Sequence, residues 1–383
     1  MFYNMSKNND DLNLKRLEIT NYTKEIKMHK YHEMLLDVLN NGHYNPNNPI
    51  KKIIIGRTVV FKLQDGFPFI KNSDSNFSDS SFKEMFWFIK GSNDISLLKA
   101  QGVNTWNNLA VNGQTVEDLL VKVIPTTLEN HESISTLYRN FFNSFINSVG
   151  HTYGTVWRFS PVYNVEKNTI WPDLNMTDIA SDKLNTYISQ YNIEKPKDEK
   201  GNEVSLETYI ISMHHSHIDQ LQLLITGLKK NPYEGNHVVT SWLPSYIPYS
   251  NVSPQENVIM NKAAAIPENT MFQCTVVANP NPNGKPLLNL HLHQRSVDVI
   301  ADFSTTVSQY AFLLSLLAHV TDMEPNEFIY SIGEAYIKND PDTLVATIET
   351  QLSHNQIDPV QLKFNPEKTD IYTIVMDDII IGG

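Results

Sequence analysis

One segment constrains the fold of this chain more than any other: "TTVSQYAFLLSLLAHVTDM", residues 305–323, is apolar nearly all round. A helix without a broad polar face is stable only when other elements surround it. We therefore expect a central, buried helix here. At 383 residues with 41% hydrophobic content, the chain is long enough to build the core that such a helix needs.

The remaining patterns predict both helices and strands. Amphipathic helices are expected at about residues 28–40, in a serine-capped segment that ends at Gly91, and in "HIDQLQLLITGLKKNP". Strand-like runs surround Gly56, as two short strands or one bulged strand, and recur in "HVVTSWLP" and near the end of the chain. Because strands and helices do not alternate regularly, we predict an α+β fold.

The sequence also suggests how the chain is divided. Residues 1–27 are polar and are interpreted as an N-terminal extension, followed by one catalytic domain over residues 28–383. Two polar or loop-rich stretches, at about residues 160–216 and 245–270, are interpreted as insertions into that domain.

Composition excludes several classes of protein. A net charge of −12 argues against binding of duplex nucleic acid, which depends on phosphate neutralisation. No segment has the length of apolar sequence that would span a membrane, and the first residues lack a signal-peptide core. With a single cysteine, no internal disulfide can form, so we expect a cytoplasmic protein, in the host cytoplasm if the source is viral.

That single cysteine, Cys274, is a candidate nucleophile. It lies in "MFQCTVVANPNPNGKPLLNLHLHQRS", where two β-type runs are joined by a loop containing Asn283-Gly284, a strong hairpin signal. Folding back about this turn is expected to bring Cys274 within a residue or two of Arg295, a cation that would favour the thiolate. The alternative is that Cys274 is a small buried hydrophobic residue.

Seven separated pieces, taken in order, carry a family resemblance: "LQDGFPFI", "FKEMFWFIKG", "GVNTWNNLA", "GHTYGTVWR", "DQLQLLITGLKKNP", the hairpin from Cys274 to "QRSVDV", and "SIGEAYIK". Together they resemble the thymidylate synthase family and its pyrimidine hydroxymethylase branch, closest in character to the phage hydroxymethylases. The resemblance implies a mixed, twisted sheet packed with helices.

The resemblance permits two alignments of the cysteine segment. Matching Phe272-Gln273 to the family would place Glu268 at the nucleophile position and imply an inactive enzyme. Anchoring on Arg295 instead places Cys274 there, with a spacing one residue longer than is usual in the family. We adopt the second alignment, because the extra residue fits in the loop and "FQCT" is similar to the hydroxymethylase version.

The resemblance implies a role for each aligned residue. The Cys274 thiolate would add to C6 of a pyrimidine, so that C5 attacks the one-carbon unit of 5,10-methylenetetrahydrofolate. Glu84 would act as an acid/base through ordered water, and Tyr153 would assist proton removal from C5. The remaining assignments are Gln294, Arg295 and Ser296 at the nucleotide and its phosphate, and Asp298 and Trp106 at the folate.

The chain also departs from the family pattern. Asn236 and His237 stand where each subunit normally lends two arginines to its partner's phosphate, and only Lys51 and Lys52 lie near the position of the N-terminal phosphate arginine. Other departures affect the sugar and the base: Tyr336 and Lys338 replace the usual sugar ligands, and Thr306 occupies the base-reading position, where its hydroxyl can donate or accept.

The expected product is a hydroxymethylated nucleotide. Leu109 replaces a tryptophan that shields the reacting carbon in synthases, and the chain stops before the synthase tail that closes over folate. We therefore expect a homodimeric dUMP or dCMP hydroxymethyltransferase; the alternatives are a divergent thymidylate synthase and a non-catalytic relative.

No metal site is expected from the histidines. His214, His215 and His217 do not share one helical face, and His291 and His293 alternate on a strand, where cross-strand packing is the simpler interpretation.

Overall fold

The computed structural model describes residues 30–70, 79–123, 132–161, 217–340, 342–354 and 360–382. The chain divides into two compact units, one formed by Met1–Trp157 with Gln220–Gly383 and the other by Arg158–Asp219. The predicted N-terminal extension and nearly all of the first predicted insertion lie outside the described residues. In the second unit, β3 (Ser160–Pro161) pairs with β4 (His217–Ile218), and Arg158 forms an ion pair with Asp219 at 2.7 Å.

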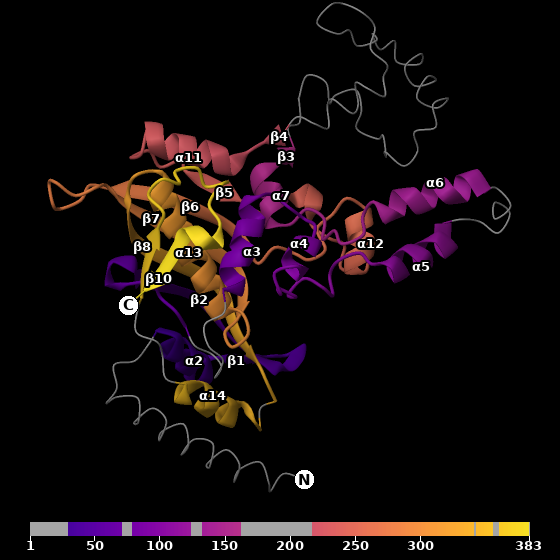
Figure 1. Cartoon of the computed structure of the whole chain (residues 1–383). Coiled ribbons are helices and arrows are strands. Elements are labelled where there is room, and N and C mark those ends of the chain that lie inside the picture. Colours follow the sequence, from indigo (N-terminus) through magenta and orange to yellow (C-terminus); the bar gives the residue numbers. More distant parts are fainter. Residues whose placement is uncertain are drawn as a thin grey trace, which may run out of the picture. The chain divides into compact units, whose positions relative to one another are not determined.

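A six-stranded mixed sheet forms the centre of the first unit (Figure 1). Its strand order is β1-β2-β8-β7-β6-β5, and all neighbours are antiparallel except β7 and β8, which are parallel. The strands are β1 (His43–Asn45), β2 (Asn48–Lys62), β5 (Val238–Thr240), β6 (Asn269–Val277), β7 (Leu287–Asp298) and β8 (Glu324–Lys338).

The central buried helix is confirmed as α13, Phe303–Val320. All of its residues except Thr305 and His319 are buried, and it packs against β7, β8 and α3 (Ser80–Ile89). Its ring contacts include Phe312 stacked on Phe82 of α3, with centroids 4.1 Å apart. The apolar side chains of α13 therefore pack against the sheet, through β7 and β8, and against the helix α3.

The other elements support the predicted α+β class, which is confirmed. They are α2 (Lys30–Asn41), α4 (Ser96–Lys99), α5 (Gly113–Val123), α6 (Glu132–Asn143), α7 (Tyr153–Arg158), α11 (Gln220–Lys230), α12 (Pro254–Ile259), α14 (Leu344–Ser353), β9 (Gln361–Phe364) and β10 (Ile379–Gly382). The stretch predicted as a second insertion contains α12, whose start is fixed by a capping box between Ser253 and Glu256.

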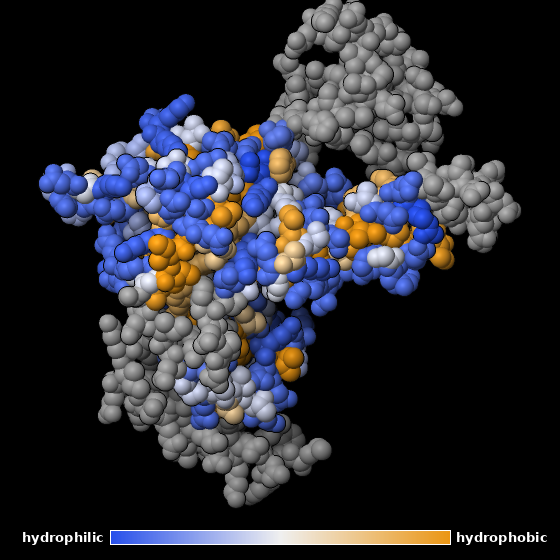
Figure 2. Space-filling view, viewed as in Figure 1, coloured by the Kyte–Doolittle hydropathy of each residue, from blue (hydrophilic) through white to orange (hydrophobic). Residues whose placement is uncertain are grey.

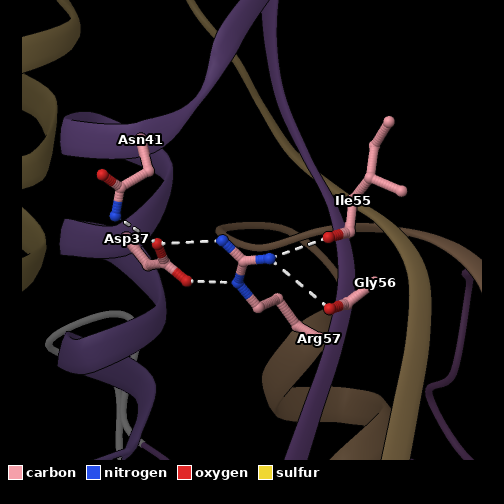
Figure 3. A network of polar contacts seen from close by, with 5 residues as sticks. All are labelled: Asp37, Asn41, Ile55, Gly56 and Arg57. Atoms are coloured by element: carbon pink, nitrogen blue, oxygen red, sulfur yellow. Dashed lines mark hydrogen bonds and ion pairs between the residues drawn. The ribbon is translucent and has the colours of Figure 1, made fainter.

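One polar network ties α2 to the long strand β2 at its irregular point (Figure 3). Gly56 has a φ of 64°, which interrupts the regular strand and is accessible mainly to glycine. The next residue, Arg57, donates to Asp37 of α2 at 2.5 Å and to the carbonyl of Ile55 at 2.8 Å. Of the two alternatives around Gly56, the single strand is the correct one, but its register with β8 is the same on both sides of Gly56, so no bulge forms there.

The helices α5 and α6 pack on each other and present apolar as well as polar side chains, as Figure 2 shows. Val121 of α5 and Phe141 of α6 are exposed, and Arg139 pairs with Glu117 across the two helices. Within the described part of the chain, none of the helices combines the length and the apolar character that crossing a bilayer requires.

Candidate functional site

The predicted hairpin forms, but its register differs from the prediction. Cys274 pairs with Leu290, not with a residue next to Arg295. Five residues of β7 separate Leu290 from Arg295, or roughly 17 Å at the usual rise of a strand. An odd separation also places the two side chains on opposite faces of the sheet. The prediction that the turn brings Cys274 to Arg295 is therefore wrong.

Cys274 lies in the hydrophobic core. Its side chain is completely buried, and its backbone N–H donates to the carbonyl of His237 at 2.8 Å. Burial raises the pKa of its thiol well above the ordinary value, and no charged group is among the causes of that shift. An environment of this kind disfavours the thiolate that a nucleophile requires.

Glu268 occupies the position beside Arg295. The backbone N–H of Arg295 donates to the carbonyl of Glu268 at 2.8 Å, just before β6 pairs with β7. This is the register of the alignment that matches Phe272-Gln273, which we had set aside. The hairpin loop is longer than we assumed, and its extra length hid this register.

A buried chain of polar side chains connects Glu268 to the central helix. Gln294 forms a side-chain hydrogen bond with Glu268 and accepts one from the hydroxyl of Tyr330, which in turn bonds to Thr306 of α13. Gln294, Tyr330 and Thr306 are all buried. The predicted ligands Gln294 and Thr306 are thus brought together, and both lie in the network that reaches Glu268.

Tyr153, at the start of α7, is held directly against the same segment. Its hydroxyl accepts from the backbone N–H of Glu268 at 3.0 Å and also from that of Asn269. Burial raises the pKa of Tyr153 well above its usual range, so the phenol stays protonated at neutral pH. Its ring packs edge-on against Phe88, with centroids 5.0 Å apart.

Glu84 of α3 is buried but well supplied with donors. Its carboxylate accepts from Thr105 at 2.9 Å and from the side chains of Trp106 and Gln309. Burial raises the pKa of Glu84, while these three hydrogen bonds oppose the shift. A carboxyl group whose pKa is raised by burial and which is held by three donors is suited to act as an acid/base.

Two further carboxyl groups lie at the end of β7 and before α13, and one further aromatic ring lies near Tyr153. Asp298 accepts from the backbone N–H groups of Ile300 and Ala301 at 3.1 and 3.2 Å through a single oxygen, Oδ1. Burial raises the pKa values of Asp298 and of Asp302, the residue preceding α13, and Asp298 raises that of Asp302 further. The half-buried ring of Trp106 lies 6.3 Å from that of Tyr153.

The predicted anion-binding groups are only partly assembled. Arg295 donates to the hydroxyl of Ser296 at 3.0 Å, which places these two predicted phosphate ligands together. His237 is buried within its own chain and bonds to the carbonyl of Asn231 at 3.1 Å, so the prediction that it reaches a partner's phosphate is wrong. Asn236 is exposed and bonds to Glu234.

The two lysines near the start of the sheet do not replace a phosphate arginine. Lys52 is buried and donates to the carbonyl of Leu39 at 2.6 Å. Lys51 pairs with Glu334 and lies 4.0 Å above the ring of Tyr336. Burial raises the pKa of Tyr336 to about 12, and Lys338 remains exposed.

The histidines on the strands make cross-strand contacts. His291 bonds to Ser331 and His293 to Thr270, each at 2.8 Å. Among the described residues, no group of three or more His, Cys, Asp or Glu side chains could hold a metal ion. His214 and His215 lie outside the described residues.

Sequence reasoning missed several members of this site: Thr105, Asn269, Asp302, Gln309 and Tyr330. Gln309 follows Thr306 by about one helical turn. The spacing therefore predicts that both residues lie on the same face of the central helix. Tyr330 and Asn269 could not be found without the strand register.

Comparisons with known proteins agree with this fold. A family model described as thymidylate synthase matches residues 29–383. A thymidylate synthase from Mycoplasma genitalium is 23% identical over 367 residues, covering 93% of this chain and 96% of the relative. One from Staphylococcus haemolyticus is 25% identical over 359 residues, covering 92% and 93%.

Proposed function

Because the chain belongs to the thymidylate synthase family, we propose that it transfers a one-carbon unit to C5 of a pyrimidine nucleotide, as a divergent member of that family. The observation that carries this proposal is the clustering of Tyr153, Gln294, Arg295 and Thr306 around one segment, residues 267–269. Three of these four residues, Gln294, Arg295 and Thr306, are among those that we assigned to the nucleotide.

Family membership confirms the resemblance seen in the sequence. Members of this family are one-carbon transferases that bind pyrimidine nucleotides and use 5,10-methylenetetrahydrofolate as the donor. The described residues fit that donor: Asp298 uses one carboxylate oxygen for two backbone donors, and Trp106 presents a half-buried ring. Asp298 would hold the pterin, and Trp106 would line its pocket.

The chain's own groups can support proton transfer at the ring. Glu84 lies among three donors and would exchange protons with the O4 or N4 edge of the base through ordered water. The hydroxyl of Tyr153 is fixed by backbone N–H groups and, as a neutral phenol, would orient the water that receives the hydrogen leaving C5. Arg295 and Ser296 would bind the phosphate.

The names of the relatives favour a methylated product, as formed by a thymidylate synthase. A second candidate product, the hydroxymethylated nucleotide, is favoured by Leu109. This side chain packs against the core beside Trp106. A smaller side chain in place of a large ring would leave the reacting carbon less shielded from water. A homodimer is part of the proposal, but His237 is not one of the residues that it would share.

The test is incubation of the protein with 5,10-methylenetetrahydrofolate and a panel of dUMP, dCMP, deoxyuridine and deoxycytidine, followed by mass spectrometry. Methylation would be accompanied by dihydrofolate. Hydroxymethylation would give a product that is one oxygen atom heavier than the methylated nucleotide. The folate product would then be tetrahydrofolate, which is not oxidised. Absence of a C5 product from every pyrimidine would contradict the proposal and favour a non-catalytic relative.

A further inference from the structure

Glu268 lies beside Arg295, at the position that one of the two alignments gives to the nucleophile, and Cys274 lies in the core. We propose that Glu268 is the general base of this site, activating a water molecule that adds to C6 of the pyrimidine in place of a protein thiol. The inference rests on the proposed function, since it supplies the step that makes C5 reactive.

The backbone fixes Glu268 from two sides. Its N–H donates to the hydroxyl of Tyr153 on α7, and its carbonyl accepts from the N–H of Arg295 on β7. The side chain is bonded to Gln294, whose own carbonyl accepts from Tyr330. A carboxylate held by this network is preorganised, as a catalytic group must be.

Two orphaned polar atoms flank Glu268. The Nε of Arg295 and the Oδ1 of Asn269 are buried, and neither has a hydrogen-bond partner within the described part of the chain. Asn269 is only 6% exposed. Buried polar atoms are almost always paired with protein, ligand or water, so an unpaired donor and acceptor here indicate that a polar ligand or water completes the site.

The charges around Glu268 favour a stronger base. Burial raises the pKa of its carboxyl, Asp302 and Asp298 raise it further, and Arg295 and the hydrogen bond from Gln294 oppose the shift. The facing groups are Tyr153 from α7, Arg295 and Asp298 from β7, Asp302 at the start of α13, and Tyr330 and Tyr336 from β8. A base works best when its pKa approaches the working pH.

The proposed step balances without an oxidant or reductant. Glu268 removes a proton from water as the water oxygen bonds to C6, and the electron pair of the C5–C6 double bond becomes available at C5. In the exchange reaction, C5 uses that pair to take a proton from solvent water. The original C5 proton then passes to water and its electron pair restores the double bond, while the C6 hydroxyl takes back the proton from Glu268 and leaves as water.

The test is exchange of the C5 hydrogen of dUMP or dCMP with deuterated solvent, measured without folate by mass spectrometry. The wild type should exchange this hydrogen. Glu268→Gln should slow the exchange by about 10²- to 10⁴-fold, the usual contribution of a general base, and Glu268→Asp should recover part of the rate. Cys274→Ala should exchange at the wild-type rate, because its side chain lies in the core.

The pH profile separates a carboxylate base from a thiolate. The wild-type rate should rise as the pH increases through the raised pKa of Glu268, because the base form is the deprotonated one. A mechanism that depended on the Cys274 thiolate would instead rise only above about pH 8–9, the range of an ordinary thiol, because burial raises the pKa of this thiol. Far-ultraviolet circular dichroism of Glu268→Gln should match the wild type, so that a slow rate is not a folding defect.

Two outcomes would overturn the inference: undiminished exchange in Glu268→Gln, or no exchange in the wild type. If the wild-type protein forms a C5 product with folate and Glu268→Gln forms it equally fast, the result supports one-carbon transfer and contradicts the proposed role of Glu268. Exchange that depends on Glu268 without any folate product would support the role of Glu268 and contradict the proposed function.

Discussion

Cys274→Glu should lose at least about 4 kcal/mol of stability, which for a typical domain is a large share of the total. The thiol is completely buried opposite Leu290, and among the described residues no cation contributes to the shift of its pKa. The new side chain would either bring an unpaired charge into the core or stay neutral and overpack it. Urea unfolding followed by circular dichroism measures the loss.

The matched control is Cys274→Val, which keeps the position apolar and of similar size. It should change the free energy of unfolding by less than about 1.5 kcal/mol. A stable, well-folded Cys274→Glu protein would mean that this position opens to solvent or to a cation, and would return Cys274 to the candidate site.

Gly154→Ala should weaken both the fold and the site. A Cβ at Gly154 would lie 2.5 Å from the carbonyl oxygen and 2.7 Å from the Cα of Phe88, so α7 and α3 would have to move apart. Overpacking of this kind costs about 1–3 kcal/mol. Tyr153 begins the same helix, so its hydrogen bond to the N–H of Glu268 should also be disturbed, and C5 exchange should slow.

Gly113→Ala is the control for this substitution. A Cβ there has no atom within 4 Å, and the residue begins α5. Because alanine restricts the unfolded chain more than glycine does, this variant should be unchanged or more stable by up to about 1 kcal/mol. If both alanine variants behaved alike, close packing of α7 on α3 would not explain the glycine at position 154.

Much of the fold follows from local patterns. Residues 305–323 are apolar nearly all round, and a helix without a polar face has to be buried, so this segment predicts α13. The Asn283-Gly284 turn predicts the β6–β7 hairpin. The register of that hairpin could not be predicted from the turn alone. A long loop tolerates several registers, and the choice among them depends on which side chains fit the core.

The site was predicted residue by residue with uneven success. Glu84, Tyr153, Gln294 and Arg295 resemble family residues in well-matched segments, and the structure brings three of them to Glu268. The prediction that Cys274 lies beside Arg295 was wrong, because we chose between two alignments by the reactivity of cysteine and not by the strand register. The burial of Cys274 depends on long-range packing, which the sequence around it does not reveal.

The claim that the site is built around Glu268 and that Cys274 lies in the core is tested most directly by alkylation of the native protein with iodoacetamide. The products are identified by intact mass and peptide mapping. The wild type has one cysteine, and a reagent reaches a core thiol only when the structure opens. The alkylation rate of Cys274 in the native protein should therefore be lower than its rate in the unfolded protein, by a factor on the order of a thousand or more. Glu268→Cys should gain one readily modified thiol at position 268, and dUMP should protect it. Rapid alkylation of native Cys274 that dUMP prevents would contradict a site built around Glu268.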